Sequence, residues 1–198
     1  MSTMADPYRL PVDPVGRFSP GWWAMVLVIA TEAMFFVYLL FGYLYLDSLA
    51  RGAWPPEGPP RLTLAAPNTV LLLASSGTTW WAEREITRGA IGRFRIGLLV
   101  TFILGASFLG IQGLEYARER FTPSSHAYGS LFFTITGFHA AHVAVGLLML
   151  LVVQLRAAFG HFDARRHLAV ANVTMYWHFV DAVWVVVFTT LYLLPNLG

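Results

Sequence analysis

Carboxyl and imidazole side chains of this sequence lie inside long apolar stretches or at the end of one, and six of them are candidates for a functional site. Carboxyl groups and imidazoles transfer protons and can bind metal ions, so these residues have the chemistry that a functional site needs. Removing a charge from water is costly, and apolar surroundings therefore favour the neutral form of each group. The six candidates are Glu32, Glu115, His139, His142, His178 and Asp181.

Glu32 is the one carboxylic acid in the apolar stretch LVIATEAMFFVYLL. We predict that Glu32 is neutral at neutral pH and hydrogen-bonded to a neighbouring helix, where it fixes helix packing or a lipid-lined path. A proton-handling or lipid-gating role is the alternative. The rest of its stretch is a poor relay, because its only titratable groups are Tyr38, Tyr43 and Tyr45.

Two histidines in the segment GFHAAHV, His139 and His142, are three residues apart and share one face of a helix. They are either ligands of haem or a metal, or partners in interhelical hydrogen bonds to a carbonyl or a carboxylate. A paired-haem site needs matching histidines on a second helix, and only His178 is available there. We therefore favour the hydrogen-bonding role.

His178 and Asp181, in the segment YWHFVDAVW, have the same spacing. We predict that they satisfy each other as an internal polar pair; a proton relay is the alternative. The sequence has no cysteine, which excludes disulfides, thiolate iron–sulfur or copper sites and c-type haem attachment. The loops also lack a nucleophile–base pair and metal-ligand spacing, so we expect neither a catalytic residue nor a metal site.

Long apolar helices must position these side chains. Hydrophobic residues make up 57% and charged residues 12% of the 198 residues, and the mean hydropathy is +0.59. A soluble domain carries about 25% charged residues, and a membrane-spanning helix needs roughly 20 apolar residues. The sequence thus predicts an all-α integral membrane bundle of five transmembrane helices, at residues 22–46, 67–87, 96–114, 128–155 and 169–194.

The second of these blocks is the weakest, because Glu83, Arg84 and Glu85 interrupt it. The first 20 residues contain four prolines and no apolar core of a signal peptide. We expect residues 1–21 to form a surface N-terminal strap and residues 22–198 to form the five-helix membrane domain.

The arginines predict the orientation, since the chain has no lysine. If the spans alternate, one side of the membrane receives Arg9, Arg17, Arg84, Arg88, Arg93, Arg95, Arg156, Arg165 and Arg166. Cytoplasmic loops are enriched in basic residues, so the N-terminus is expected in the cytoplasm and the C-terminus outside. The net charge of +2 then reflects topology, and we expect no nucleic-acid partner.

Five motifs, each in its own apolar block, resemble subunit III of the haem–copper terminal oxidases, the cytochrome c oxidase family. They are ATEAMFF, PNTVLLLASS, LGIQGLEY, YGSLFFTITGFHAAHV and YWHFVDAVW. The resemblance extends from about Pro20 to the C-terminus and is to the short five-helix bacterial form. The long form of this family has seven helices, of which the last five match.

The resemblance implies an accessory subunit of a proton-pumping respiratory complex in the bacterial cytoplasmic (inner) membrane. Such a subunit holds no cofactor of its own, because the haems and copper belong to subunits I and II. It packs against subunit I, binds membrane phospholipid, supports proton uptake and protects the oxidase during turnover. Glu32 matches the glutamate that carbodiimides modify in this family.

The sequence is also compatible with other functions. The short form also resembles subunits of quinol oxidases and nitric oxide reductases. A haem-binding membrane cytochrome would use His139, His142 and His178. A proton-coupled transporter would be built around Glu32 and Asp181, but the span centres lack the proline and paired glycine of broken transporter helices.

Overall fold

The structure is a computed structural model that describes residues 19–50 and 54–197. Its five long helices are α1 (Pro20–Leu49), α2 (Leu62–Thr87), α3 (Ile91–Arg118), α4 (Ala127–Ala158) and α5 (Leu168–Phe188). A π-helical segment, η1 (Thr189–Leu193), and the short α6 (Leu194–Leu197) continue α5. The described residues include no strand, which agrees with the predicted all-α fold.

Residues 1–18 of the predicted N-terminal strap lie outside the described residues. Helix α1 begins at Pro20, so the last two residues of the predicted strap, 20 and 21, are helical. Ser19 accepts a hydrogen bond on Oγ from the Trp22 amide at 3.2 Å, and Pro20 occupies the first helical turn, so both residues favour a helix start here.

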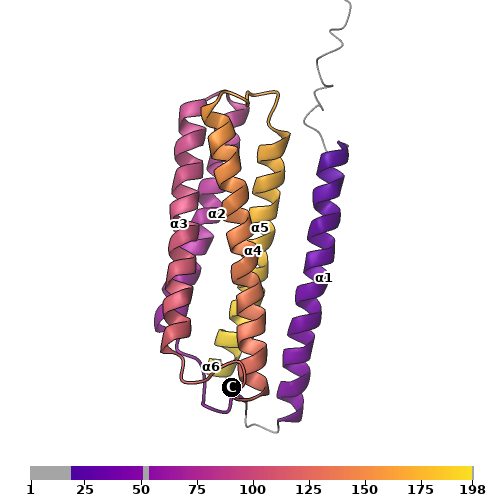
Figure 1. The fold of residues 1–198 in the computed structure, drawn as a ribbon, viewed down its shortest axis with the longest axis vertical. Coiled ribbons are helices and arrows are strands. Elements are labelled where there is room, and N and C mark those ends of the chain that lie inside the picture. Colours follow the sequence, from indigo (N-terminus) through magenta and orange to yellow (C-terminus); the bar gives the residue numbers. More distant parts are fainter. Residues whose placement is uncertain (1–18, 51–53, 198) are drawn as a thin grey trace, which may run out of the picture.

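Helices α2 to α5 form a bundle, and α1 lies along one side of it against α4 and α5 (Figure 1). Helices α2 and α3 form a tight antiparallel hairpin that turns at Gly89, whose φ of +75° is the left-handed conformation favoured at helix C-termini. The Ala90 amide donates to the Glu85 carbonyl at 2.9 Å, which completes the turn. The hairpin fixes where the polar residues of α2 meet the other helices.

Every helix extends beyond the apolar block predicted for it, because helix continues into the polar ends of the bundle. Two helices begin five residues early: α2 begins at Leu62 instead of Pro67, and α3 begins at Ile91 instead of Ile96. Proline disrupts the interior of a helix, yet α2 continues through Pro67 in its second turn.

Four helical stretches of the described chain are long and apolar enough to cross a membrane: α1, α3, α4 and the continuous stretch Leu168–Leu197. The remaining long helix, α2, is less apolar because it carries polar residues along its inward face. Asn68, Ser75 and Thr79 of this helix have no exposed surface. The low hydropathy of α2 therefore reflects polar groups inside the bundle.

Trp177 of α5 shows how closely the helices pack. Its indole nitrogen donates to Ser75 Oγ of α2 at 2.9 Å. A Cβ atom added at Gly105 of α3 would lie 2.6 Å from the indole, and one added at Gly146 of α4 would lie 2.9 Å from it. Small residues of this kind allow close helix approach in membranes.

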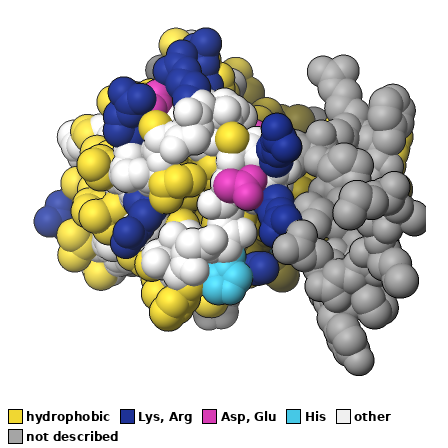
Figure 2. Space-filling model, turned by 90° about the horizontal axis from the view of Figure 1, so that it is seen from above, with side chains coloured by type: hydrophobic (Ala, Val, Ile, Leu, Met, Phe, Trp, Pro, Cys, Tyr) yellow, Lys and Arg dark blue, Asp and Glu magenta, His cyan; other side chains and the backbone are white. Residues whose placement is uncertain are grey.

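Arginine side chains gather at the end of the bundle where α2 meets α3 and α4 meets α5, and Figure 2 shows this end in space-filling form. The helices and turns at this end contain Arg84, Arg88, Arg93, Arg95, Arg156, Arg165 and Arg166. Glu85 is 2% exposed there and pairs with Arg88 at 2.8 Å and Arg93 at 2.7 Å. These ion pairs hold the α2–α3 turn.

Candidate functional site: the Glu32–His142 pair and the buried polar groups

Glu32 of α1 and His142 of α4 form a hydrogen-bonded pair between the two helices. His142 Nε2 lies 3.0 Å from Glu32 Oε2, and its Nδ1 lies 2.7 Å from the Phe138 carbonyl oxygen. The Phe36 ring packs edge-on against the imidazole, with 5.1 Å between the ring centroids. The predicted hydrogen bond from Glu32 to a neighbouring helix is confirmed, and so is the predicted bond of His142 to a carboxyl group.

The hydrogen-bond partners of His142 determine which atoms carry the hydrogens between the two side chains. A carbonyl oxygen can only accept, so Nδ1 carries hydrogen and Nε2 of a neutral imidazole is an acceptor. A neutral Glu32 then donates its O–H to Nε2; transfer of that proton would give an imidazolium–carboxylate pair. Either way the pair shares one proton across the α1–α4 contact.

The expected burial of Glu32 inside the bundle is incomplete. Its side chain is 37% exposed, against 15% for His142, because α1 lies on the outside of the bundle. The pair lines an apolar cavity of about 330 Å³ between α1, α4 and α5. Its lining also includes Met25, Val28, Ala141, Val145, Met149 and Tyr176.

A second apolar cavity of about 370 Å³ continues along α4 and shares Val145 and Met149 with the first. Its lining also includes Arg156, near the arginine-rich end of the bundle. We call the two cavities together the α4 groove. It therefore joins a proton-sharing pair at one end to a cationic side chain at the other, with apolar walls between them.

His139 lies one helical turn from His142 but in a different environment. It is 1% exposed and is surrounded by aromatic rings, with centroid distances of 4.8 Å to Trp184, 5.8 Å to Phe108 and 6.3 Å to Phe36. Neither ring nitrogen has a hydrogen-bond partner among the described residues. The predicted hydrogen bond of His139 to a carbonyl or carboxylate is thus absent, because ring packing fills the space around the imidazole.

His178 and Asp181 do not form the predicted hydrogen-bonded pair. His178 Nδ1 instead lies 2.5 Å from Ser76 Oγ of α2. Asp181 is 3% exposed, and neither of its carboxylate oxygens has a partner among the described side chains and backbone. The serine competes successfully because α2 packs directly against α5 at this level.

Glu115 lies in the last turn of α3 and is 5% exposed. Its Oε2 atom has no hydrogen-bond partner within the described chain, and neither do the amide atoms of Gln112 or the hydroxyl of Tyr192. The π-helical segment η1 carries Tyr192. Glu115 is thus a separate buried acid near one end of the bundle.

Sequence reasoning missed the side chains of α2 that complete these contacts. Ser75 and Ser76 bind Trp177 and His178, and Thr69 Oγ1 accepts from the Trp184 indole at 2.9 Å. The segment ASSGTT indicates close packing by its small residues, but the hydroxyl partners lie more than 100 positions away in the sequence. Only the three-dimensional pairing of α2 with α5 identifies them.

These features define a class of protein: a multi-pass membrane helix bundle that buries proton-carrying side chains. Within the described part of the chain, no group of three or more His, Cys, Asp or Glu side chains has a geometry that could hold a metal ion. Residues 21–195 match the family described as cytochrome c oxidase subunit III. The chain belongs to this family and is a subunit III of a terminal oxidase.

Individual relatives agree with this assignment. The chain is 37% identical over 178 residues to cytochrome c oxidase subunit 3 of Arabidopsis thaliana, an alignment that covers 86% of this chain and 67% of that protein. It is 36% identical over 199 residues to the subunit 3 of Latimeria chalumnae, with 96% of this chain and 74% of that protein covered. The subunit 3 of Artemia franciscana is 37% identical over 174 residues.

Proposed function

We propose that this chain is the non-catalytic subunit III of a proton-pumping terminal oxidase, in which subunit I reduces oxygen and subunits I and II hold the haems and copper. One observation supports the accessory role most directly: the mid-membrane histidines are tied up by protein groups. His142 is bonded on both ring nitrogens, His178 is bonded through Nδ1 to Ser76, and His139 is enclosed by aromatic rings. Haem ligation would have to break a hydrogen bond of His142 or displace the rings around His139.

The α4 groove supports phospholipid binding by this subunit. Its apolar lining suits acyl chains, and Arg156 at its end suits a lipid phosphate, since arginine binds phosphate through charge-assisted hydrogen bonds. In this proposal the Glu32–His142 pair fixes α1 beside the groove and does not carry pumped protons. Subunit III then supports proton uptake by subunit I by holding this side of the complex in place.

We further propose that α2 is the fifth transmembrane span. It packs extensively against α3, which is apolar enough to span, and its polar residues Asn68, Ser75 and Thr79 are buried. The arginine-rich end would face the cytoplasm by the positive-inside rule, so the N-terminus is cytoplasmic and the C-terminus outside. The resemblance to the short bacterial form supports a location of the complex in the bacterial cytoplasmic membrane.

Gentle detergent purification of the tagged chain tests the proposal. We expect subunits I and II to co-purify, with haem and copper signals that follow subunit I in amount. Mass spectrometry would also distinguish a cytochrome c oxidase from a quinol oxidase or a nitric oxide reductase by the partner subunits found. A chain that always purifies alone, or that shows its own Soret band, would contradict the accessory role.

A further inference from the structure

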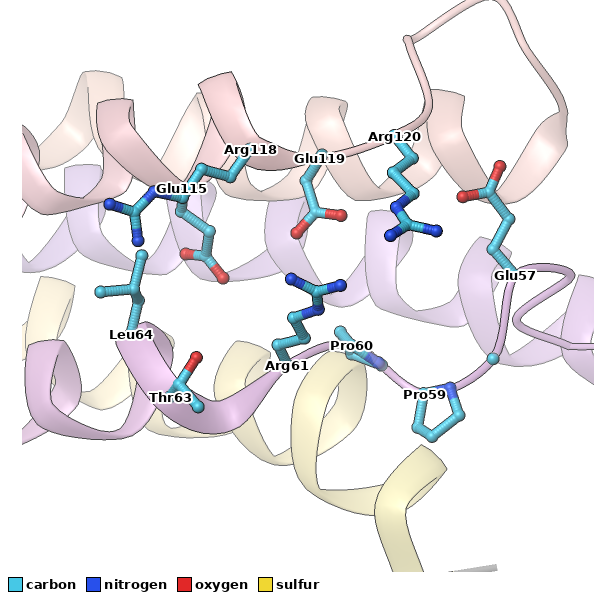
Figure 3. Close-up of a pocket in the computed structure, with 11 residues that line it drawn as sticks. Glu57, Pro59, Pro60, Arg61, Thr63, Leu64, Glu115, Arg118, Glu119 and Arg120 are labelled. Carbon is cyan, nitrogen blue, oxygen red and sulfur yellow. The ribbon is translucent and has the colours of Figure 1, made fainter.

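A charged pocket of about 160 Å³ lies at the end of the bundle opposite the arginine-rich end. The loop before α2 and the first turn of α2 form one wall, and the last turn of α3 and the residues after it form the other (Figure 3). Its charged side chains are Glu57, Arg61, Glu115, Arg118, Glu119 and Arg120. We call it the α2–α3 pocket; it shares no lining residue with the α4 groove.

The pocket lies at the level of the lipid head groups. Between Arg95 and Glu115, α3 has 19 residues without a formal charge. At about 1.5 Å per residue this stretch is about 29 Å long, close to the roughly 30 Å thickness of the hydrocarbon core. The turn of α3 that carries Glu115 and Arg118 therefore emerges where the hydrocarbon ends.

The charges of the pocket are close together but not paired. Figure 3 shows the Arg61 guanidinium and the carboxylates of Glu115 and Glu119 pointing towards the same space. Even so, no ion pair joins an arginine to a glutamate of this pocket within the described chain; its one ion pair runs from Glu57 to His126 at 3.7 Å. The space between the opposite charges is large enough for a ligand.

The carboxylates of Glu57 and Glu119 are the accessible acceptors of the pocket, since neither side chain is fully buried. Glu115 also lines the pocket but is only 5% exposed, and its buried Oε2 atom lies close to the Gln112 and Tyr192 side chains. Partial burial raises the pKa of the Glu119 carboxyl, while the Arg61 guanidinium acts against that rise.

We propose that the α2–α3 pocket binds a phosphoethanolamine head group, with the phosphate on the arginine side and the primary ammonium on the glutamate side. A zwitterion of this kind meets both signs of charge at once, and its N–H donors suit the carboxylates of Glu57 and Glu119. Arg61, Arg118 and Arg120 supply donors that suit phosphate. Exposed apolar side chains further along the two helices, Val70 of α2 at 65% and Leu114 of α3 at 54%, offer a surface for the acyl chains.

This site is independent of the proposed role in an oxidase and needs only that α3 spans a membrane. The test is native mass spectrometry of the delipidated, purified complex, to which lipids with identical acyl chains are added singly. We expect phosphatidylethanolamine to be retained better than phosphatidylcholine, whose quaternary ammonium has no N–H, and better than phosphatidylglycerol, which has no cation. Equal retention of all three lipids would overturn the proposal.

Variants then locate the site. Arg61→Gln and Glu119→Gln should each weaken phosphatidylethanolamine retention roughly tenfold, the factor that corresponds to about 1.4 kcal/mol. The matched control is Arg165→Gln, an exposed arginine at the other end of the bundle, which should change nothing. Because these lining residues are not in the core, the variants should assemble normally. Unchanged lipid selectivity in both pocket variants would also overturn the proposal.

A soluble competitor identifies the source of the ligand. If free phosphoethanolamine displaces the lipid, the head group alone is sufficient for binding, and a free metabolite can then also be the ligand. If only the lipid binds, the acyl chains contribute and the membrane is the source. Both results support the head-group site, and they leave the oxidase role to be judged by co-purification alone.

Discussion

At the scale of single residues, the Glu32–His142 hydrogen bond is the most informative contact. It explains why a carboxyl group lies in the middle of an apolar helix: the acid has a partner on α4, and the two share one proton. The pair fixes α1 to the bundle at mid-membrane. No other described titratable group is hydrogen-bonded to Glu32, as a proton relay would require.

Substitution of Glu32 tests this role. Glutamine keeps an N–H donor for Nε2 of His142, so Glu32→Gln should leave oxygen reduction and proton release per electron close to wild type. Glu32→Ala leaves Nε2 without a partner, at a cost of about 1–3 kcal/mol, and should loosen α1 and lower retention of the subunit. Proton release in reconstituted vesicles is the measurement. Loss of pumping in a fully assembled Glu32→Gln complex would place Glu32 on the proton path.

Ser76 should matter more for stability than Asp181, because it is the serine that binds His178. Ser76→Ala leaves the imidazole without this partner and should lower the free energy of unfolding by about 1–3 kcal/mol. Asp181→Asn removes no hydrogen bond formed within the described chain and should cost less. Thermal unfolding of the purified complex would rank them, with the exposed Ser107→Ala as control. A larger loss in Asp181→Asn would show that Asp181 has an essential partner.

At the scale of elements, two glycines decide how closely α3, α4 and α5 pack. Gly105→Ala and Gly146→Ala would each drive a methyl group into Trp177, and such overpacking costs about 1–3 kcal/mol. Gly110→Ala is the matched control on α3, because a Cβ there meets nothing within 4 Å. All three glycine-to-alanine changes raise the helix propensity by the same amount. A melting temperature that is lower in Gly105→Ala and Gly146→Ala than in Gly110→Ala would therefore come from the clash with Trp177. Equal melting temperatures would show that α5 shifts to make room.

The fold was largely predictable from the sequence because long apolar blocks leave few structures other than membrane helices. The side-chain contacts were less predictable. Gly105, Gly110 and Gly113 are all small residues of the kind that permits close helix packing, yet a Cβ atom at Gly110 or Gly113 would meet no neighbour within 4 Å. Helix periodicity shows which residues share a face, but not which face meets another helix.

The same limit explains the outcome for the candidate site. Glu32 and His142 were both singled out, and an acid without an arginine in its span could be satisfied by a histidine, a neutral donor, bound water or another chain. The choice of His142 over His139, and of Ser76 over Asp181, depends on how the helices are rotated against one another. That rotation is set by the whole packed bundle, including Trp177 and its glycine contacts.

At the scale of the whole molecule, the chain leaves much of its apolar surface exposed. Only 11% of the most apolar 18-residue stretch of α1 is buried within the chain. Lipid or other subunits must cover the remainder, as expected of one component of a membrane complex. The arrangement suits a subunit that supports its neighbours through packing and bound lipid.

Deletion of this subunit tests that central claim most directly. Haem and copper content per subunit I should be measured in complexes purified with and without the chain, together with the number of turnovers before activity is lost. We expect metal content to remain nearly intact and activity to decay faster without the chain. Complete loss of haem while subunit I is still present, or an unchanged lifetime of activity, would contradict the accessory role.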